Sequence, residues 1–446
     1  MHECLDVWAG TINRMQIAGA LSNSDLHELS QHIMSGVFLP FVNQLSPPPL
    51  SFANTYSVVQ HHEVVRKTLI EYVAFGAVEI IGPVSEHTPP YVQPLHVIVK
   101  PGRDPRLVID LSRNLNSFLP DISFKYESIT RALQCSSANC YFSKLDVSKC
   151  YLSFALSPLC YKYFVFCFDG VYYRFVRMPF GLSTAPRICT LLLSVIAYEL
   201  QVELGVVLVR YLDDFLFIAH SRASCMRMLN VAKLTFAKYG LVVNNKKTTL
   251  PTQCITFLGI EIDSVSCTLR CTEERLNELH TAIFAIMNAK CVRHNALESL
   301  VGKLSFAAAV LPGARPFMRH ILDSLHRYGK HGRTHNVNIR VSQSFHCDLA
   351  YWHHNLRVWN GRQLWRTPEP FILVSDASLH GFGFYCEHFP SSVDVSRIPA
   401  ELQLGTVFCG NYGPEHAEFH SSHRGIAWCE FILCFSSSTY LLTHSE

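Results

Sequence analysis

The chain has 446 residues, of which 49% are hydrophobic and 16% charged. This composition excludes an intrinsically disordered chain and leaves room for about two to four domains with a sizeable core. The formal net charge is only +3, so a basic surface for nucleic acid must be local.

The 17 cysteines are an odd number and include no CxxC pair. Because a disulfide framework or a zinc site would show regular spacing, we expect free thiols in a reducing compartment. The start, MHECLDVWAGTINR, lacks the basic-then-apolar order of a signal peptide. The longest apolar runs, such as Leu191–Ala197, are shorter than the roughly 20 residues that span a bilayer. The sequence therefore predicts a soluble intracellular protein, cytoplasmic or nuclear, without a membrane partner.

The first third of the chain predicts helices followed by a hairpin. SNSDLHELSQHI offers a Ser or Asp cap before apolar residues at helical spacing, and QLSPPPLSF marks a boundary. HHEVVRKTLIEYVAFG then predicts a helix that ends near Gly76. LHVIVK, PGRDP and RLVIDL are typical of a strand, a turn and a second strand.

The middle of the chain alternates strands and helices. A strand ends near Asp146, a hairpin with an Asp-Gly turn follows, and STAPRICTLLLSVIAYELQVEL predicts a helix. Two short strands flank Asp213 and Asp214, which we place in the turn, and the next helix ends at Gly240. Further strands are expected in LVVN and ITFLGIEID. This order predicts an α+β fold with an antiparallel sheet backed by helices.

The last third of the chain is expected to contain three different segments: a helical one, a linker and an α/β one. Residues 272–327 look wholly helical, and residues 328–340 are polar and typical of a linker. A final α/β segment begins at FILVSDASLHGFGFY.

Acidic residues stand beside apolar strands at two places in the sequence. Asp213 and Asp214 alone would most simply be turn residues that bond nearby backbone amides. Asp146 ends another strand, and three carboxylates that converge would repel one another in a low dielectric. Mg²⁺ would relieve that repulsion, and two such ions can support phosphoryl transfer.

Six sequence blocks together resemble the reverse transcriptase family. They are VIVKPGRDPRLVIDLSRNLN, KLDVSKCY, RMPFGLSTAPR, YLDDF, NNKKT and FLGIEID. The resemblance covers about residues 60–327 and implies a right-hand polymerase with fingers, palm and thumb. Within the family, PFGLSTAPR, YLDDFL, FLGIEID and SLVGKLSFAAAVLPGARPFMRHILD are most similar to retrotransposons of the tyrosine-recombinase (DIRS-like) group.

The resemblance implies a metal site. Asp146 and Asp213 would bind two Mg²⁺ ions, with Mn²⁺ as a possible substitute, and Asp214 would lie beside them. The backbone carbonyl of Val147 would add a ligand.

The resemblance also implies contacts to the incoming nucleotide. Lys100 and Arg106 would hold its triphosphate, a role that suits the bidentate fork of arginine. Tyr151 would be the steric gate that excludes a ribose 2′-OH, and Phe180 and Gly181 would form the floor of the nucleotide pocket. Read without the family, the two cations would be solvated turn charges and Tyr151 a packed aromatic.

Two further roles follow from the resemblance. Lys247 would protonate the pyrophosphate leaving group, with Lys246 as a close competitor. Phe257, Leu258 and Gly259 would form the primer grip, which positions the 3′-OH for attack.

The segment after Asp146 departs from the family pattern. Lys149 and Cys150 stand where relatives carry an acidic or small residue and then Ala or Gly, and Ser153 stands where many carry His. A lysine so close to a metal-binding aspartate either points away from the site or weakens metal binding.

The C-terminal segment resembles the start of a ribonuclease H domain. Asp376 would be its first metal ligand, and Glu418 the second, with Glu415 as the alternative. Ser445 stands where a third acid is expected and the sequence ends at Glu446, so we expect a truncated, inactive ribonuclease H-like region.

These observations predict four segments: 1–50 as an N-terminal extension, 51–270 as fingers and palm, 271–330 as a helical thumb, and 331–446 as an incomplete ribonuclease H-like region. The predicted function is RNA-directed DNA synthesis, with an RNA template, a DNA primer and deoxynucleoside triphosphates as partners. One alternative is a relic that binds nucleic acid without polymerising. An RNA-directed RNA polymerase shares the palm, but Tyr151 and FLGIEID argue against it.

Overall fold

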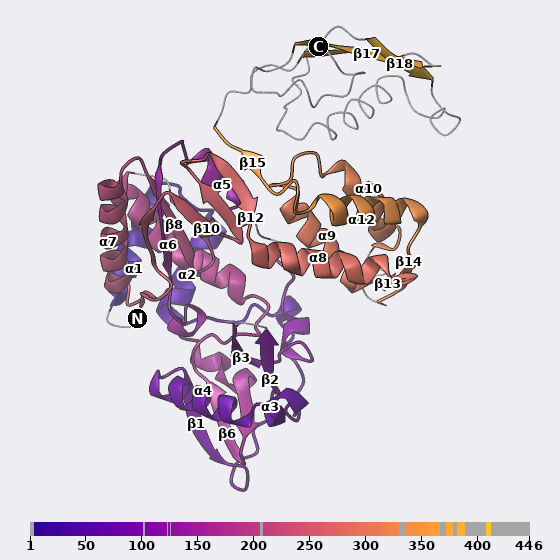
Figure 1. The fold of residues 1–446 in the computed structure, drawn as a ribbon. Coiled ribbons are helices and arrows are strands. Elements are labelled where there is room, and N and C mark those ends of the chain that lie inside the picture. Colours follow the sequence, from indigo (N-terminus) through magenta and orange to yellow (C-terminus); the bar gives the residue numbers. More distant parts are fainter. Residues whose placement is uncertain are drawn as a thin grey trace. The chain divides into compact units, whose positions relative to one another are not determined.

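The computed structural model describes residues 4–100, 103–122, 124, 126–205, 208–329, 336–365, 372–377, 381–388 and 407–411. The chain divides into two compact units (Figure 1). The first comprises Met1–Ser136 and Cys140–Thr252, and the second comprises Ser137–Asn139 and Gln253–Glu446.

The first unit combines helices with antiparallel strands. Its α-helices are α1 (Leu5–Ile17), α2 (Asn23–Ser35), α3 (Tyr56–Gln60), α4 (His62–Ala74), α5 (Ile129–Gln134), α6 (Ala185–Leu204) and α7 (Arg222–Lys238). Its strands are β1 (Val78–Pro83), β2 (Leu95–Lys100), β3 (Arg103–Ile109), β4 (Tyr141–Asp146), β5 (Val165–Phe168), β6 (Val171–Phe175), β7 (Val209–Tyr211), β8 (Asp214–Ala219) and β9 (Thr249–Thr252).

A four-stranded sheet in the order β7-β8-β4-β9 is the centre of this unit. Helix α7 packs against β4, β8 and β9, and α6 packs against α7. Apolar side chains of the strands and of α7 share one core, which includes Phe215, Phe217 and Phe236, each with less than 2% exposure. The predicted antiparallel sheet backed by helices is thus confirmed.

Two smaller sheets belong to the same unit. Strands β1, β6 and β5 form one, and β2 pairs with β3 in the other. The Asp-Gly turn predicted between β5 and β6 is present, with φ of 50° at Asp169 and 74° at Gly170. A two-residue turn with positive φ at both positions matches the twist of a hairpin, which explains the Asp-Gly pair.

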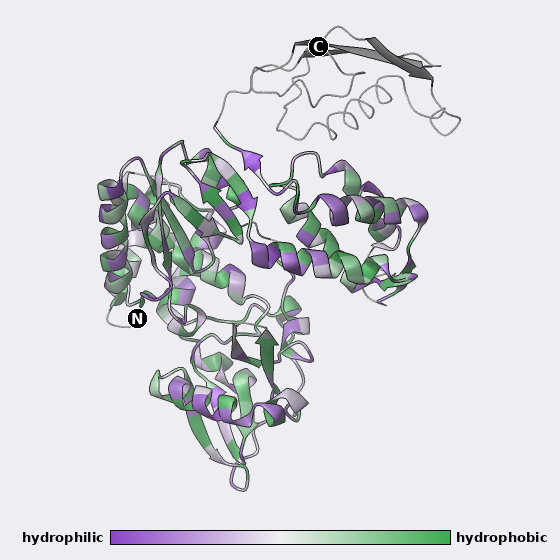
Figure 2. Cartoon of the chain, viewed as in Figure 1, coloured by the Kyte–Doolittle hydropathy of each residue, from purple (hydrophilic) through white to green (hydrophobic). Residues whose placement is uncertain are grey.

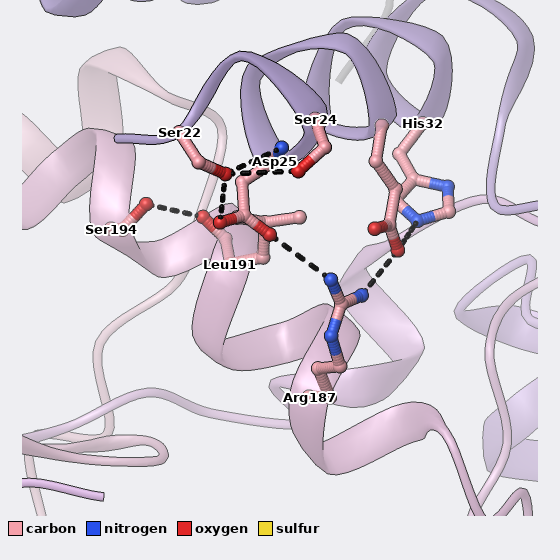
Figure 3. A network of polar contacts seen from close by, with 8 residues as sticks. Ser22, Ser24, Asp25, His32, Arg187, Leu191 and Ser194 are labelled. Atoms are coloured by element: carbon pink, nitrogen blue, oxygen red, sulfur yellow. Dashed lines mark hydrogen bonds and ion pairs between the residues drawn. The ribbon is translucent and has the colours of Figure 1, made fainter. Parts of the chain in front are cut away.

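The first 44 residues pack into the same unit. Helix α1 packs on α2 and α6, and α2 also packs on α6. Trp8 and Leu29 have no exposed surface, and the Ser22 side chain caps α2 by accepting a hydrogen bond from the Asp25 amide. Figure 3 shows Arg187 of α6 reaching across to Asp25 of α2. The N-terminal segment is therefore part of the unit's core.

Helix α6 corrects one expectation about apolar segments. Ala185–Val202 has a mean hydropathy of 1.3 and is long and apolar enough, by length and composition alone, to cross a membrane. Polar residues such as Ser194 and Glu199 interrupt its apolar runs, so the length of a single run does not reveal it. The structure buries 61% of this window, as is usual for the central helix of a core.

The second unit contains a helical part and several small sheets. Its helices are α8 (Glu273–Met287), α9 (His294–Ala307), α10 (Arg319–His326) and α12 (Gln343–Asn355). Its strands are β10 (Cys254–Phe257), β11 (Ile260–Asp263), β12 (Thr268–Cys271), β13 (Cys291–Arg293), β14 (Asn338–Arg340), β15 (Arg362–Gln363), β16 (Ile372–Ala377), β17 (Gly381–His388) and β18 (Val407–Asn411). In Figure 2, hydrophilic and hydrophobic residues alternate along α8, as expected of a helix with one buried face.

The structure corrects three expectations about secondary structure. Residues 272–327 are not wholly helical, because β13 interrupts them, and the supposed linker 328–340 supplies its partner β14. LVVN forms only an isolated bridge between Val147 and Val243, while β9, which was not predicted, pairs with β4 instead. Short strands of this kind depend on a distant partner that local sequence does not reveal.

Candidate active site

The hairpin of β7 and β8 carries the two neighbouring acids. Tyr211 pairs with Asp214, so the two-residue turn consists of Leu212 and Asp213. The expectation that both aspartates occupy the turn was therefore wrong, since Asp214 begins β8. Leu212 has φ of 53°, a conformation that is uncommon for residues other than glycine and is held here by the strands on either side.

The third acid lies on the neighbouring strand, in register with the hairpin. Asp146 at the end of β4 pairs with Asp214, and their side chains therefore project from the same face of the sheet. The Val147 amide donates to the Asp213 carbonyl over 3.1 Å, which fastens the end of β4 to the hairpin turn. The structure thus places the three predicted acids on adjoining segments: Asp146 at the end of β4, Asp213 in the turn and Asp214 at the start of β8.

The surroundings of these acids compensate their charge only in part. Burial, and then the negative charges of Asp214 and Asp146, raise the pKa of Asp213 to about 6. Burial also raises the pKa of Asp214, and the charge of Asp146 adds to the effect. Carboxylates that are costly to ionise in isolation favour a cation beside them.

The arrangement suits a metal that is shared with a substrate. Within the described parts of the chain, no three His, Cys, Asp or Glu side chains are gathered into a group that could hold an ion unaided. Mg²⁺ is usually bound by one or two carboxylates together with substrate phosphates, so a complete protein cage is not required. Asp146, Asp213 and the Val147 carbonyl fit that kind of site.

The structure distinguishes the two candidate lysines. The Lys247 ammonium lies 3.6 Å from a carboxylate oxygen of Asp146, whereas the backbone amide of Lys246 is bound to the Asn244 side chain. The Asn244 amide in turn donates to the Asp146 carbonyl over 2.8 Å. Lys247 is therefore the lysine that the turn presents to the acids.

The residues of the predicted nucleotide pocket are in contact. The ring centroids of Tyr151 and Phe180 are 5.1 Å apart, and burial raises the pKa of Tyr151. Gly181 has φ of 113°, and a Cβ atom at this position would lie 1.9 Å from the Ile109 carbonyl oxygen. Only glycine permits this close approach of β3 to the loop.

Asn116 also positions this loop, a role that the sequence did not predict. Its amide nitrogen donates to the Gly181 carbonyl over 2.9 Å, and its carbonyl oxygen accepts from the Ser183 amide over 3.0 Å. An asparagine in a polar loop is too common a feature to signal such a role.

The two predicted triphosphate cations both lie on the β2–β3 hairpin. Lys100 is the last residue of β2, and its side chain lies outside the described part of the structure. Arg106 of β3 pairs with Ile98 and is exposed.

The three residues after Asp146 that differ from the family pattern, Lys149, Cys150 and Ser153, make contacts within the surrounding structure. The Lys149 ammonium lies 4.9 Å from the centre of the Phe75 ring, so it is engaged with α4 by a cation–π contact. The Cys150 thiol is buried 3.1 Å from the thiol of Cys189 on α6, and the Ser153 hydroxyl donates to the Lys149 carbonyl.

The predicted primer grip is a hairpin turn of the second unit. Phe257 pairs with Ile260, and the turn residues Leu258 and Gly259 have φ of 55° and 78°. The Arg275 guanidinium donates to the Leu258 carbonyl over 3.2 Å and braces the turn.

The ribonuclease H-like residues are only partly described. Asp376 lies on β16 opposite Gly383 of β17, in an antiparallel sheet that continues to β18. Its side chain, and the whole of Glu418, Glu415, Ser445 and Glu446, lie outside the described residues.

An antiparallel sheet backed by helices, with acids at the adjoining ends of its two inner strands, defines the palm of a template-directed nucleic-acid polymerase. Residues 98–262 match the family described as reverse transcriptase (RNA-dependent DNA polymerase). This segment of the chain is therefore similar to a reverse transcriptase domain.

Relatives of known name support the same assignment. The chain is 26% identical to Protein P of heron hepatitis B virus over 203 residues. This alignment covers 45% of this chain and 24% of that protein. It is also 26% identical to the retrovirus-related Pol polyprotein from transposon gypsy of Drosophila melanogaster over 176 residues. This alignment covers 38% of this chain and 17% of that protein. The chain thus spans less than a quarter of the length of these relatives.

Solved structures show the same fold. The foamy viral protease-reverse transcriptase in complex with double-stranded DNA superposes with a TM-score of 0.59 at 15% identity, over 96% of this chain and 71% of that chain. Its complex with an RNA/DNA hybrid gives a TM-score of 0.55 at 16% identity, over 96% of this chain and 55% of that chain. The predicted right-hand polymerase fold is confirmed.

Proposed function

We propose that this protein is an RNA-directed DNA polymerase of a retrotransposon, which adds deoxynucleotides to the 3′-OH of a primer. The observation that carries the proposal is the register of the palm sheet. Asp146 pairs with Asp214, and Asp213 stands at the adjoining turn with a pKa raised to about 6. A half-buried set of acids of this kind is suited to bind cations together with a triphosphate.

Asp146, Asp213 and the Val147 carbonyl would hold two Mg²⁺ ions, for which Mn²⁺ is a possible substitute. Reverse transcriptases generally use divalent metal ions, and when bound these ions offset the charge on the phosphates. The protein's own groups bind and orient the reactants. Lys247 is placed to donate a proton to the departing pyrophosphate, and Tyr151, packed on Phe180, limits space at the sugar.

Support for the partners comes from related proteins. The foamy viral enzyme has been seen with double-stranded DNA and with an RNA/DNA hybrid. By analogy we propose an RNA template, a DNA primer and deoxynucleoside triphosphates for this chain, contacted mainly through phosphates and groove shape. Lys100 and Arg106 would meet the triphosphate, and Phe257, Leu258 and Gly259 the primer end.

Several finer points belong to the same proposal. We place the chain in the tyrosine-recombinase (DIRS-like) group on its sequence blocks and in the cytoplasm or nucleus on its thiols. Cys150 and Cys189, for example, are thiols and do not form a disulfide with each other. The predicted segment boundaries after residues 50, 270 and 330, and a ribonuclease H-like region with Asp376 and Glu418, are likewise proposals.

Primer extension tests the polymerase proposal. The protein is expected to extend oligo(dT) on poly(rA) with dTTP and Mg²⁺ or Mn²⁺, and Asp213→Asn is expected to abolish extension. No extension by the unsubstituted protein would favour the alternative, a relic that binds nucleic acid without polymerising. Equal extension by both proteins would refute the metal assignment.

A second measurement tests the gate. Tyr151→Ala is expected to admit ribonucleotides, because the ring beside Phe180 is removed. Tyr56→Ala is the matched control, since Tyr56 is 74% exposed on α3. Unchanged sugar selectivity in Tyr151→Ala would contradict the role of Tyr151.

A further inference from the structure

Lys144 lies on the same face of the palm sheet as the catalytic acids. It precedes Asp146 by two positions on β4, and alternate residues of a strand project from the same side. Lys144 pairs with Leu216 of β8, whereas Asp146 pairs with Asp214, so Lys144 and Asp214 are diagonal neighbours. The Lys144 ammonium lies 3.9 Å from a carboxylate oxygen of Asp214.

The three acids differ in their cationic partners. Asp146 faces Lys247, whose side chain is 62% exposed and follows a turn, so it can move away. Asp214 faces Lys144, whose side chain is 23% exposed and whose backbone is held between β8 and β9. Among the described residues, no ion pair is formed by the Asp213 side chain.

We propose that Lys144 is the built-in counter-ion of Asp214, which withholds Asp214 from full metal coordination and sets the divalent-cation affinity of Asp146 and Asp213. This proposal rests on the proposed function, because it assigns a second lysine to the same metal site. Lys144 acts through Asp214 and is therefore a positioning residue.

Charge balance gives the sign of the effect. Lys144→Met keeps most of the side-chain volume and removes one positive charge, so the cluster becomes more negative and Asp214 is freed to bind an ion. We expect Mn²⁺ to bind about three- to tenfold more tightly to Lys144→Met, because the ion is no longer repelled by a positive charge that lies near it and close to the protein surface. Lys144→Arg retains the charge and should bind Mn²⁺ as the unsubstituted protein does.

The test is a titration of the full chain with Mn²⁺, in which paramagnetic resonance measures the free ion. It needs no catalytic turnover. Lys233→Met on α7 is the matched control and should leave Mn²⁺ affinity unchanged. Thermal unfolding of each variant verifies that it is folded.

A double substitution separates a specific counter-ion from a background charge. In an Asp214→Asn background, most of the gain from Lys144→Met should disappear, because the freed carboxylate is no longer there. The same gain in both backgrounds, or no gain at all from Lys144→Met, would overturn the role of Lys144. Failure of the unsubstituted protein to bind Mn²⁺ would instead overturn the proposed metal site and this inference with it.

Discussion

The first unit contains two sets of buried carboxylates that behave in opposite ways. Burial, unopposed by donors from other side chains, raises the pKa of Asp213 to about 6. Burial also acts on Glu199 of α6, but hydrogen bonds from Lys238, Tyr239 and Thr11 outweigh it and lower its pKa to about 2. The contrast teaches that the number of donors, and not burial alone, separates a structural acid from one that is available to bind a cation.

Glu28 of α2 belongs with Glu199. Hydrogen bonds with His32 and Arg187 lower the pKa of Glu28 to about 2 against the effect of burial. Arg187 also binds Asp25 over 3.1 Å (Figure 3) and lies in the first turn of α6, shortly after the loop of Phe180 and Gly181. The satisfied acids therefore connect the N-terminal helices to α6, which follows the loop of Phe180 and Gly181.

The largest expected effect is at the unsatisfied acid. Replacing a residue that only supports a metal ligand lowers activity by roughly 10- to 100-fold. Asp213→Asn changes a proposed ligand itself, so it should lower polymerase activity by more than about 100-fold. The same change should stabilise the metal-free protein by about 1–2 kcal/mol above pH 6, because an amide has no charge to bury. Rates of primer extension and urea unfolding at pH 7 measure the two effects. A loss of stability would contradict the contrast with Glu199.

A satisfied acid should respond in the opposite direction. Glu199→Gln should lower the free energy of unfolding by about 1–3 kcal/mol, because glutamine keeps one acceptor oxygen and replaces the other with an NH2 donor. Either the Lys238 ammonium or the hydroxyls of Thr11 and Tyr239 then lose their acceptor. Urea unfolding at pH 7 measures this change. Glu63→Gln on α4 is the control, since its side chain is 81% exposed, and it should change stability little. Equal effects at both positions would show that the network contributes nothing.

The dependence of stability on pH should follow the satisfied acids. Glu28 and Glu199 have folded-state pKa values of about 2 against an ordinary value of 4.5, so their contribution is complete above pH 4.5 and is lost as the pH falls toward 2. A protein with both Glu28→Gln and Glu199→Gln should therefore show a flatter fall in stability between pH 4.5 and 2. Urea midpoints measured across this range test the expectation, and an unchanged slope would refute it.

The smallest effect is expected at Lys149. Its ammonium lies over the Phe75 ring, so Lys149→Met should cost about 0.5–1 kcal/mol of stability and leave Mn²⁺ affinity within about twofold. Mn²⁺ titration and thermal unfolding provide the two measurements. Lys144→Met, which removes a lysine that contacts Asp214, is the informative comparison. A change in Mn²⁺ affinity of much more than twofold in Lys149→Met would show that the Lys149 ammonium interacts with the acids and not mainly with the Phe75 ring.

Much of the site was predictable from sequence because its signals are local or ordered along the chain. Turn residues such as Asp169-Gly170 and the cap at Ser22 follow from backbone preferences of single residues. The order of the blocks around Asp146 and Asp213 carried the resemblance to reverse transcriptases, and the match over residues 98–262 supports it.

Other features required the tertiary structure, because they depend on which residues meet across the fold. Strand register decides that Asp146 faces Asp214 and that Lys144 reaches the same carboxylate. The turn after Val243 decides that Lys247, and not Lys246, contacts Asp146.

The sequence by itself determined the resemblance to reverse transcriptases, the three candidate acids, and the alternation of strands and helices that holds them. Only the tertiary structure decided how each charge is compensated. It turns Lys149 toward Phe75, surrounds Glu199 with donors and leaves Asp213 without them. The physical reason is that side-chain type and backbone preference are local properties, whereas the free energy of a buried charge depends on neighbours that are distant in sequence.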